Sequence, residues 1–223
     1  MTADVLVVMA RQPIPGTVKT RLAQSIGADA AAALYRAFLI DIAAGCASPA
    51  WSLVWAVTPI DADLTPIVGG AARQIVQRGD GLGERMQHAF ADLFAAGARR
   101  VVMIGADAPH LGAACIAEAF AALATHDVVL APTQDGGYCL IGLTAPRELF
   151  RGVAMGTDSV RAETLARAAA LGLRVAQQAQ TFDIDLPADL ETLAVLLDRA
   201  ALRLPATAAA LASMRRGGAP PGA

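Results

Sequence analysis

The sequence predicts an α/β fold around a largely parallel sheet. Short apolar runs typical of buried strands alternate with segments of helical composition along the 223 residues. Hydrophobic residues make up 55% of the chain and aromatic residues only 4%, so the core should be large and aliphatic. Neither an internal repeat nor a linker divides the chain, and its length favours one domain. We therefore expect a single domain over residues 1–205 and a partly disordered tail over 206–223, which lacks structure from Arg215 onwards.

The expected strands are apolar runs bounded by turn residues. Residues 5–9 form an unbroken apolar run, as in a strand that is buried on both faces. The segment 138–143 follows its predecessor too closely for a helical crossover, which makes it a candidate for an antiparallel strand in a mixed sheet. The other expected strands are 51–57, 73–77, 100–104, 127–131 and 173–177.

Helices are expected between these strands. Two prolines and a glycine make residues 11–19 a loop, after which a helix begins and breaks at Gly27. Asp29 suits the N-cap of the next helix, whereas residues 61–70 fit either a helix or a loop. Pro187 fits the first turn of the last helix. The expected helices are 29–44, 84–96, 113–124, 157–170 and 187–202.

Composition excludes several classes of protein. The net charge of −2 argues against a nucleic-acid-binding protein but permits a local basic loop for a small anion. Cys46, Cys115 and Cys139 lack metal-type spacing, so we expect buried free thiols in a reducing compartment. The N-terminus lacks the pattern of a signal peptide, and no apolar run is long enough to span a membrane. We expect a cytoplasmic protein.

Acidic residues follow three of the expected strands. Asp107 and Asp135 each come after one strand, and Asp183 and Asp185 follow another. Open α/β sheets place their chemistry at the carboxyl ends of strands. Asp183 and Asp185 are two residues apart, so in an extended chain they share one face. Because Mg²⁺ or Mn²⁺ prefers one or two carboxylates together with phosphate oxygens and water, this pattern predicts a divalent metal and a phosphorylated substrate.

Each of these carboxylates also has a structural alternative. Asp107 can cap a helix or close a turn, and Asp185 can cap the helix that begins two residues later. The pair Asp135-Gly136 is a hairpin-turn signal. Gly136 and Gly137 together also permit a sugar or an acceptor to lie against the backbone.

A basic loop, Arg11 to Arg21, follows the first expected strand. Lys19 and Arg21 lie close to Gly16, where the backbone can approach a phosphate. A lysine is a point charge for phosphate oxygens, and an arginine can bind two of them at once. The alternative is a solvated basic loop. The Gly-Lys-Ser/Thr ending of a Walker loop is absent, as is the dinucleotide-binding glycine pattern.

A glycine-rich turn, Gly79 to Gly83, precedes the helix expected from Glu84. Free amides and the helix dipole suit an anion or the polar edge of a base there, although such turns are common. Glu84 also suits a first helical turn, whereas Arg85 works against the dipole and so favours a contact elsewhere. Of the three histidines, only His110 lies near one of the acidic strand ends.

The order of these motifs resembles the DUF2064 family, bacterial transferases that are often found beside radical-SAM proteins and are placed in the nucleotide-diphospho-sugar transferase (GT-A) superfamily. The resemblance covers about residues 5–195. Its motifs stand in order as MARQPIPGTVKTRL at 9–22, GLGERM at 81–86, IGADAP at 104–109, DGGY at 135–138 with LIGL at 140–143, and DIDLPADL at 183–190.

The resemblance implies a GT-A fold, which is a Rossmann-like three-layer αβα sandwich with a mixed, mostly parallel sheet. It also implies a nucleotide-diphosphate ligand and a divalent metal, Mg²⁺ or Mn²⁺. Asp107 looks like the metal-binding aspartate that replaces the Asp-x-Asp motif of this superfamily, and Asp185 looks like a second ligand with Asp183 in support.

The same resemblance implies roles for the other site residues. Phosphates would be held by Arg11, Gly16, Lys19 and Arg21. The base or ribose would be approached by Gly81, Leu82, Gly83, Glu84 and Arg85. The sugar or acceptor would be bordered by Gly136, Gly137, Tyr138 and Thr157. Where the family usually has Trp-Ser/Gly-Thr, this chain has Met155-Gly156-Thr157, so the acceptor choice would differ here if the family's aromatic residue stacks on a substrate.

The leading functional hypothesis is a metal-dependent transferase that moves a glycosyl group from a nucleotide-diphospho-sugar to a small acceptor. The metal on Asp107 and Asp185, helped by Lys19 and Arg21, would neutralise the leaving nucleoside diphosphate, and Asp135 or Asp183 would be the general base. The alternative is a nucleotidylyltransferase that couples a nucleoside triphosphate to a phosphorylated acceptor and releases pyrophosphate, because the Lys-Thr-Arg-Leu stretch also resembles the phospholactate guanylyltransferases. A third hypothesis is a nucleotide-binding domain without turnover.

Overall fold

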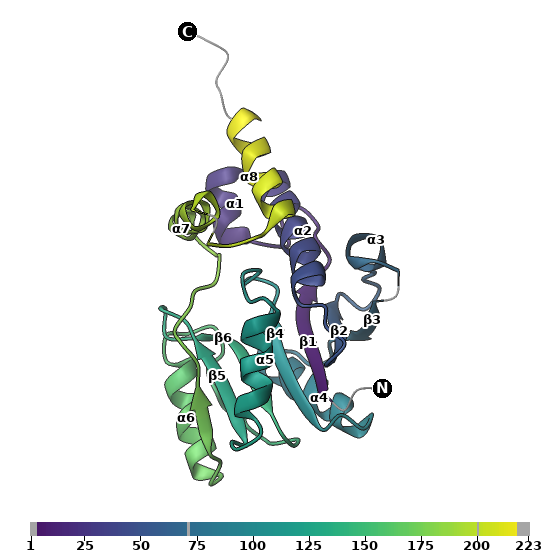
Figure 1. Cartoon of the computed structure of the whole chain (residues 1–223), viewed down its shortest axis with the longest axis vertical. Coiled ribbons are helices and arrows are strands. Elements are labelled where there is room, and N and C mark those ends of the chain that lie inside the picture. Colours follow the sequence, from purple (N-terminus) through teal and green to yellow (C-terminus); the bar gives the residue numbers. More distant parts are fainter. Residues whose placement is uncertain (1–3, 71, 200, 218–223) are drawn as a thin grey trace.

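A seven-stranded mixed sheet forms the centre of the molecule (Figure 1). The computed structural model describes residues 4–70, 72–199 and 201–217. The strand order is β3-β2-β1-β4-β6-β5-β7, and β6 runs antiparallel to both of its neighbours while the other pairs are parallel. The short connection before β6 therefore predicted its direction correctly. The strands are β1 (Asp4–Arg11), β2 (Ser52–Thr58), β3 (Arg73–Val76), β4 (Arg100–Gly105), β5 (Val128–Pro132), β6 (Tyr138–Leu143) and β7 (Val175–Gln177).

Helices cover both faces of the sheet. Successive side chains of a strand point to opposite faces, and in β1 Leu6 and Val8 join the cluster under α1, α2, α5 and α7, while Val5 and Val7 join the cluster under α4 and α6. This arrangement confirms the three-layer α/β prediction. The helices are α1 (Thr20–Ile26), α2 (Ala28–Gly45), α3 (Thr65–Val68), α4 (Leu82–Ala95), α5 (Ala113–Ala122), α6 (Val160–Ala170), α7 (Pro187–Asp198) and α8 (Pro205–Gly217).

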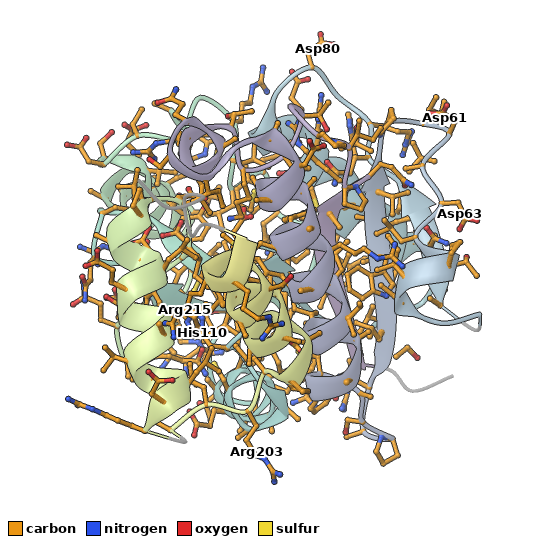
Figure 2. All side chains as sticks on the ribbon, turned by 90° about the horizontal axis from the view of Figure 1, so that it is seen from above. Asp61, Asp63, Asp80, His110, Arg203 and Arg215 are labelled. Carbon is orange, nitrogen blue, oxygen red and sulfur yellow. The ribbon has the colours of Figure 1, made fainter. Side chains whose placement is uncertain are left out.

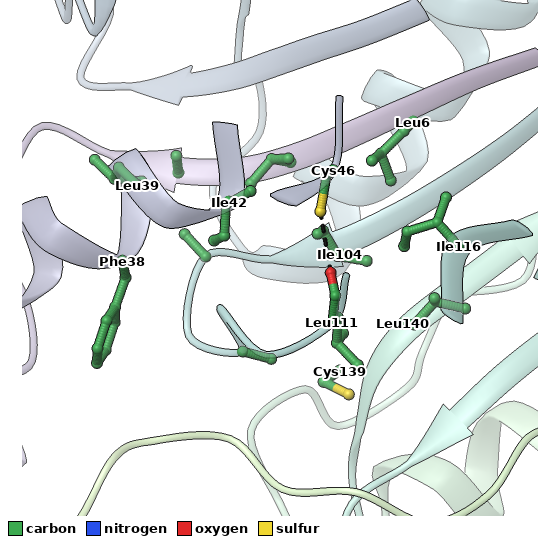
Figure 3. Packing of buried hydrophobic residues seen from close by; sticks show 14 of the residues in the cluster. Leu6, Phe38, Leu39, Ile42, Cys46, Ile104, Leu111, Ile116, Cys139 and Leu140 are labelled. Carbon is green, nitrogen blue, oxygen red and sulfur yellow. Dashed lines mark hydrogen bonds between the residues drawn. The ribbon is translucent and has the colours of Figure 1, made fainter. Parts of the chain in front are cut away.

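The larger cluster lies between the sheet and helices α2 and α5. Phe38, Ile42 and Ile104 are fully buried in it (Figure 3). The thiol of Cys46 donates a hydrogen bond of 3.0 Å to the carbonyl of Leu111, which joins the end of α2 to the loop after β4. Burial raises the pKa of the Cys46 thiol to about 12, so it stays protonated. All three cysteines are free thiols, as predicted, although only two are buried.

The C-terminal segment differs from the prediction. Instead of a tail that begins at residue 206, the chain forms helix α8, which packs against α2 (Figure 2). The buried carboxylate of Asp41 in α2 accepts hydrogen bonds from the amides of Ala206 at 3.0 Å and Thr207 at 2.7 Å. These bonds satisfy two amides in the first turn of α8. The stabilising partner lies far away in sequence, so local composition did not reveal it. The predicted disorder of 218–223 falls outside the described residues.

Some element boundaries also differ from expectation. Gly27 separates α1 from α2 with φ 86°, and it is the N-cap of α2 in place of Asp29, which lies in the first turn. Residues 61–70 contain the short helix α3. Helix α6 begins at Val160, because the hydroxyl of Thr157 donates to the carbonyl of Ala154 at 2.8 Å and closes a turn there. No helix in the described ranges has the length and apolar composition needed to cross a membrane.

Candidate functional site

A cavity of about 760 Å³ opens at the carboxyl ends of β1 and β4. From β1 the sheet continues to β2 on one side and to β4 on the other, so the strand order reverses here. Ligands of open α/β sheets bind at such a switch point. Figure 1 shows α1 and α7 beyond this end of the sheet. The predicted site residues that line the cavity are Arg11, Lys19, Arg21, Leu82, Arg85, Asp107, Asp135, Gly137, Tyr138, Thr157, Asp183 and Asp185.

Lys19 lies at the centre of the predicted site. Its backbone has φ 49° and ψ 42°, a left-handed conformation that residues other than glycine seldom adopt. Its ammonium contacts the carboxylates of Asp107 and, at 2.9 Å, Asp185, and it donates to the carbonyl of Ile184 at 2.6 Å. The side chain is only 2% exposed. Burial by itself lowers the pKa of Lys19, but the two carboxylates outweigh burial and raise the pKa, so the ammonium stays charged.

Neither Asp107 nor Asp185 caps a helix, although Asp107 does lie in the turn that follows β4. Gly112 is the N-cap of α5, so Asp107 caps no helix there. At α7 the carboxylate of Asp189 accepts from the amides of Asp185 at 2.9 Å and Leu186 at 2.6 Å. Because Asp189 does the capping, the carboxylate of Asp185 is directed to Lys19 instead. Both carboxylates remain partly exposed to the cavity, by 47% for Asp107 and 37% for Asp185.

The segment between β7 and α7 crosses the sheet edge to bring Asp185 to β4. The amides of Gln178 and Thr181 donate to carbonyls of β5, each at 2.8 Å. The amide of Ile184 then donates to the carbonyl of Asp107 at 3.0 Å. His110 supports this path, because its Nε2 lies 2.7 Å from the hydroxyl of Thr181. Burial lowers the pKa of His110 to about 4, so the histidine expected near the site is a neutral support outside the cavity lining.

Asp183 and Asp135 add further negative charge to the cavity. Burial, followed by the charges of Asp135 and Asp185, raises the pKa of Asp183 to about 6. In Asp135, Oδ1 accepts from the hydroxyl of Thr133 at 2.5 Å and from the amide of Gly137 at 3.1 Å. These bonds support the hairpin-turn alternative for Asp135, and its role as a general base stays a prediction.

Two carboxylates, and not three, converge on one cation position. Asp107 and Asp185 contact the same ammonium. Among the described residues there is no group of three or more histidine, cysteine, aspartate or glutamate side chains arranged to hold a metal. Since Mg²⁺ takes one or two carboxylates and completes its shell with phosphate oxygens and water, this pair fits a divalent ion that arrives with a nucleotide. The prediction that Asp183 is a ligand remains untested.

The glycine-rich turn faces two cavities. Leu82 lines both the central cavity and a second one, while Gly81, Gly83 and Glu84 line only the second. Glu84 has a structural role, because its Oε2 accepts from the amide of Asp80 at 2.9 Å. The Nε of Arg85 donates to the carbonyl of Gly79 at 2.9 Å, which holds its guanidinium at the edge of the central cavity.

Two further predicted glycines, outside the glycine-rich turn, also do not line the central cavity. Gly16 has φ 79° and forms the exposed turn of the basic loop. Gly136 has φ 88°, and a Cβ atom there would lie 2.0 Å from the carbonyl oxygen of Asp158. Gly136 therefore permits the hairpin to approach the start of α6. Tyr138 is also partly structural, since burial raises its pKa to about 12 and its hydroxyl lies 3.3 Å from that of Thr164.

Several polar residues of the cavity were missed from the sequence, and three of them have informative positions. Gln77 follows β3 and donates to the carbonyls of Ala10 at 3.0 Å and Ala56 at 2.7 Å. Asp80 lies in the glycine-rich turn (Figure 2). The strand-end rule could have found both. Tyr35 accepts a hydrogen bond from the amide of Arg11 at 3.0 Å. It stands in the middle of α2, where no local pattern marks it.

Residues 42–157 match a protein family described as an uncharacterized protein conserved in bacteria, DUF2064. The chain belongs to the DUF2064 family. The matched region includes β4 with Asp107 and the hairpin with Asp135, whereas Lys19 and Asp185 lie on either side of it. No curated protein matches the sequence.

Solved structures of the same fold extend the comparison. The "putative nucleotide-diphospho-sugar transferase" of Desulfovibrio desulfuricans G20 is 32% identical, with a TM-score of 0.89 over 97% of this chain and 98% of that one. CMP:2-keto-3-deoxy-manno-octonic acid synthetase complexed with CTP is 13% identical, with a TM-score of 0.51 over 88% and 98%. Rv0371c of Mycobacterium tuberculosis H37Rv in complex with manganese is also 13% identical, with a TM-score of 0.51 over 85% and 97%.

Proposed function

We propose that this DUF2064 protein is a transferase that binds a nucleotide-diphospho-sugar at the β1–β4 switch point and transfers the glycosyl group to a small acceptor. The observation that carries the proposal is the convergence of Lys19, Asp107 and Asp185 in one cavity at this position. A strand-end pair of carboxylates with basic residues around it suits a diphosphate that arrives with a divalent cation. The 32% identical relative with a transferase name supports the same reading.

We assign phosphate binding to the arginines of the cavity. Arg11 and Arg21 lie at the two ends of the loop after β1, and Arg85 stands across the cavity at the start of α4. Arginine binds two phosphate oxygens at once in a fixed geometry. We place the diphosphate over the carboxyl ends of β1 and β4, where these arginines would screen the negative charge that develops on the leaving group.

Asp107 and Asp185 are the residues that would hold Mg²⁺ or Mn²⁺. When bound, such an ion stabilises negative charge on the leaving nucleoside diphosphate. The manganese complex of a protein with the same fold supports the use of a divalent metal. Residues of the hairpin between Thr133 and Tyr138 and the turn at Thr157 also line the cavity, and there we place the sugar and the acceptor.

The second candidate is nucleotidyl transfer with release of pyrophosphate. Two observations favour it as the alternative: a synthetase of the same fold binds CTP, and the three cavity arginines suit a triphosphate. The two reactions differ in their products, because glycosyl transfer releases a nucleoside diphosphate.

A thermal-shift panel of nucleoside triphosphates, nucleoside diphosphates and nucleotide sugars, each with and without Mg²⁺ or Mn²⁺, tests the proposal. A ligand at about 100 times its dissociation constant stabilises the fold by roughly 2.7 kcal/mol, which such an assay detects. We expect a metal-dependent shift with a nucleotide sugar, its loss in Asp107→Asn, and its retention in Asp61→Asn, a control on an exposed loop.

The other outcomes are equally informative. A shift confined to one triphosphate, with pyrophosphate formed in the presence of a phosphorylated sugar, would replace glycosyl transfer by nucleotidyl transfer. No shift with any nucleotide would overturn both candidates. In turnover assays Asp107→Asn should lower the rate about 100-fold or more, as for the loss of one group that stabilises transition-state charge.

A further inference from the structure

Position 19 holds the only lysine of the chain, and every other strongly basic side chain is an arginine. An ammonium is a compact ion with three donors, whereas a guanidinium is a planar fork with five. The nitrogen of the single lysine is enclosed by the loop after β4, the segment before α7 and the ring of Phe38, whose centroid lies 5.7 Å away, and this setting suits a compact cation.

All three donors of the Lys19 ammonium are accounted for in this arrangement. They meet Asp107, Oδ1 of Asp185 and the carbonyl of Ile184. A lysine that is satisfied in this way, with its side chain 2% exposed, has no donor left for a phosphate oxygen. Phosphate binding by Lys19 therefore requires that at least one of these contacts be given up.

The two acidic partners of Lys19 are also the carboxylates proposed to hold the divalent ion. One oxygen of each already contacts the ammonium. A divalent ion that bridges the two carboxylates at this position must displace the ammonium, since two cations cannot share one position. Asp183 feels the charges of Asp107, Asp135 and Asp185, so negative charge gathers beside this position and favours an ion of higher charge, although arginines line the same cavity.

We propose that the Lys19 ammonium and a divalent cation are alternative occupants of the Asp107–Asp185 pair, so that the ligand of this site is a metal–nucleotide complex. The metal alone binds weakly because it must displace a buried ammonium. When a nucleotide arrives with the metal, the displaced ammonium gains phosphate oxygens in exchange for its carboxylates. This inference rests on the proposed function, in which Asp107 and Asp185 hold the metal.

The exchange predicts a definite coupling between the two ligands. A nucleoside diphosphate should raise the affinity for Mn²⁺, and Mn²⁺ should raise the affinity for the nucleotide by the same factor. Couplings between bound ligands typically reach about 5- to 150-fold. Lys19→Met removes the competing ammonium, so we expect it to bind Mn²⁺ alone about tenfold or more tightly than the wild-type protein and to lose most of the coupling.

The test is a titration of the protein with Mn²⁺ alone, in which the electron paramagnetic resonance signal of the free ion measures binding. It is repeated in the presence of UDP, GDP, CDP or ADP. Arg11→Met is the matched control, since it removes one positive charge from the same cavity but leaves the ammonium on its carboxylates. A gain in Mn²⁺ affinity that is confined to Lys19→Met supports the exchange. Equal gains in both variants would show that loss of any positive charge in the cavity has this effect, and would overturn the proposal.

A second measurement needs no substitution. Protein labelled with ¹⁵N-lysine has one side-chain ammonium signal, because there is one lysine. We expect that signal to persist when Mg²⁺ alone is added and to move when Mg²⁺ and a nucleoside diphosphate are added together. A signal that moves with Mg²⁺ alone, or that stays unchanged in the full complex, would overturn the proposal.

Failure of the inference is distinct from failure of the proposed function. If nucleotides bind with metal but Lys19→Met leaves the affinity for Mn²⁺ alone unchanged, the exchange is wrong and the transferase proposal stands. If no nucleotide binds, the transferase proposal falls, while the Mn²⁺ titrations of Lys19→Met and Arg11→Met still decide whether the ammonium and a divalent ion compete.

Discussion

Replacing Asp41 by asparagine should loosen helix α8 from the body of the protein. The carboxylate of Asp41 is buried and receives the amides of Ala206 and Thr207, one on each oxygen. Asparagine keeps one acceptor oxygen and turns an NH₂ group, which cannot accept, toward the other amide. One buried N–H is then left without a partner at the start of the helix.

The size of the effect follows from the bonds that are lost. A hydrogen bond to a charged group contributes about 1.5–3 kcal/mol. We expect Asp41→Asn to lower the free energy of unfolding by about 2 kcal/mol and Asp41→Ala, which loses both bonds, by about 3 kcal/mol. In a protein of this size 1 kcal/mol shifts Tm by about 2–4 °C, so the asparagine variant should melt roughly 4–8 °C lower.

Urea unfolding followed by circular dichroism measures the change in stability. Hydrogen exchange of peptides that cover 205–217 then shows whether α8 opens before the sheet. Asp61→Asn is the control, since Asp61 lies on an exposed loop (Figure 2) and its change should stay within about 0.5 kcal/mol of the wild type. An equally small change in Asp41→Asn would refute the capping role of Asp41.

Two further substitutions test the site and its hairpin. The pKa of Asp183 is raised to about 6 by burial and by neighbouring carboxylates, so the folded state holds a proton that the unfolded chain releases near pH 4. The stability from this proton is full below about pH 4 and is lost as the pH rises through 6. In urea unfolding, Asp183→Asn should thus be more stable than the wild type at pH 7.5, and the difference should be smaller at pH 4.5. A difference in stability that does not depend on pH would contradict the raised pKa of Asp183. Gly136→Ala adds a Cβ atom 2.0 Å from the carbonyl oxygen of Asp158, at φ 88°, and should lower the urea-unfolding free energy by more than about 2 kcal/mol. Gly156→Ala has a similar φ of 79° but no neighbour within 4 Å, so it should lose only about 1 kcal/mol, and equal losses would contradict the steric argument.

Much of the fold could be predicted from local patterns. Continuous apolar runs marked the strands, because a strand covered on both faces must be apolar throughout. The short link before β6 indicated its antiparallel direction, since a parallel partner needs a long crossover. Helix α8 was not predicted, because the amides at its start donate hydrogen bonds to Asp41, a residue that only the folded chain brings near.

Part of the lining of the candidate cavity could be predicted, whereas the contacts between its residues could not. Strand-end positions marked Lys19, Asp107 and Asp185, because parallel strands bring their carboxyl ends to one edge of the sheet. Spacing alone did not show that Asp189 takes the capping role beside Asp185, or that Gly136 serves a close approach to Asp158. These roles depend on distances between segments that are far apart in sequence.

The sequence by itself determined which segments are buried strands, where polar residues follow them and that the site combines cations with carboxylates, since burial and strand direction follow from local composition. Only the tertiary structure decided the pairing within that site. It encloses the ammonium of Lys19 between two carboxylates that precede α5 and α7, and in it the carboxylate of Asp135 accepts a hydrogen bond within a hairpin. Pairing is a property of three-dimensional distance, and the chain reaches it only when the segment before α7 crosses the sheet edge to meet β4.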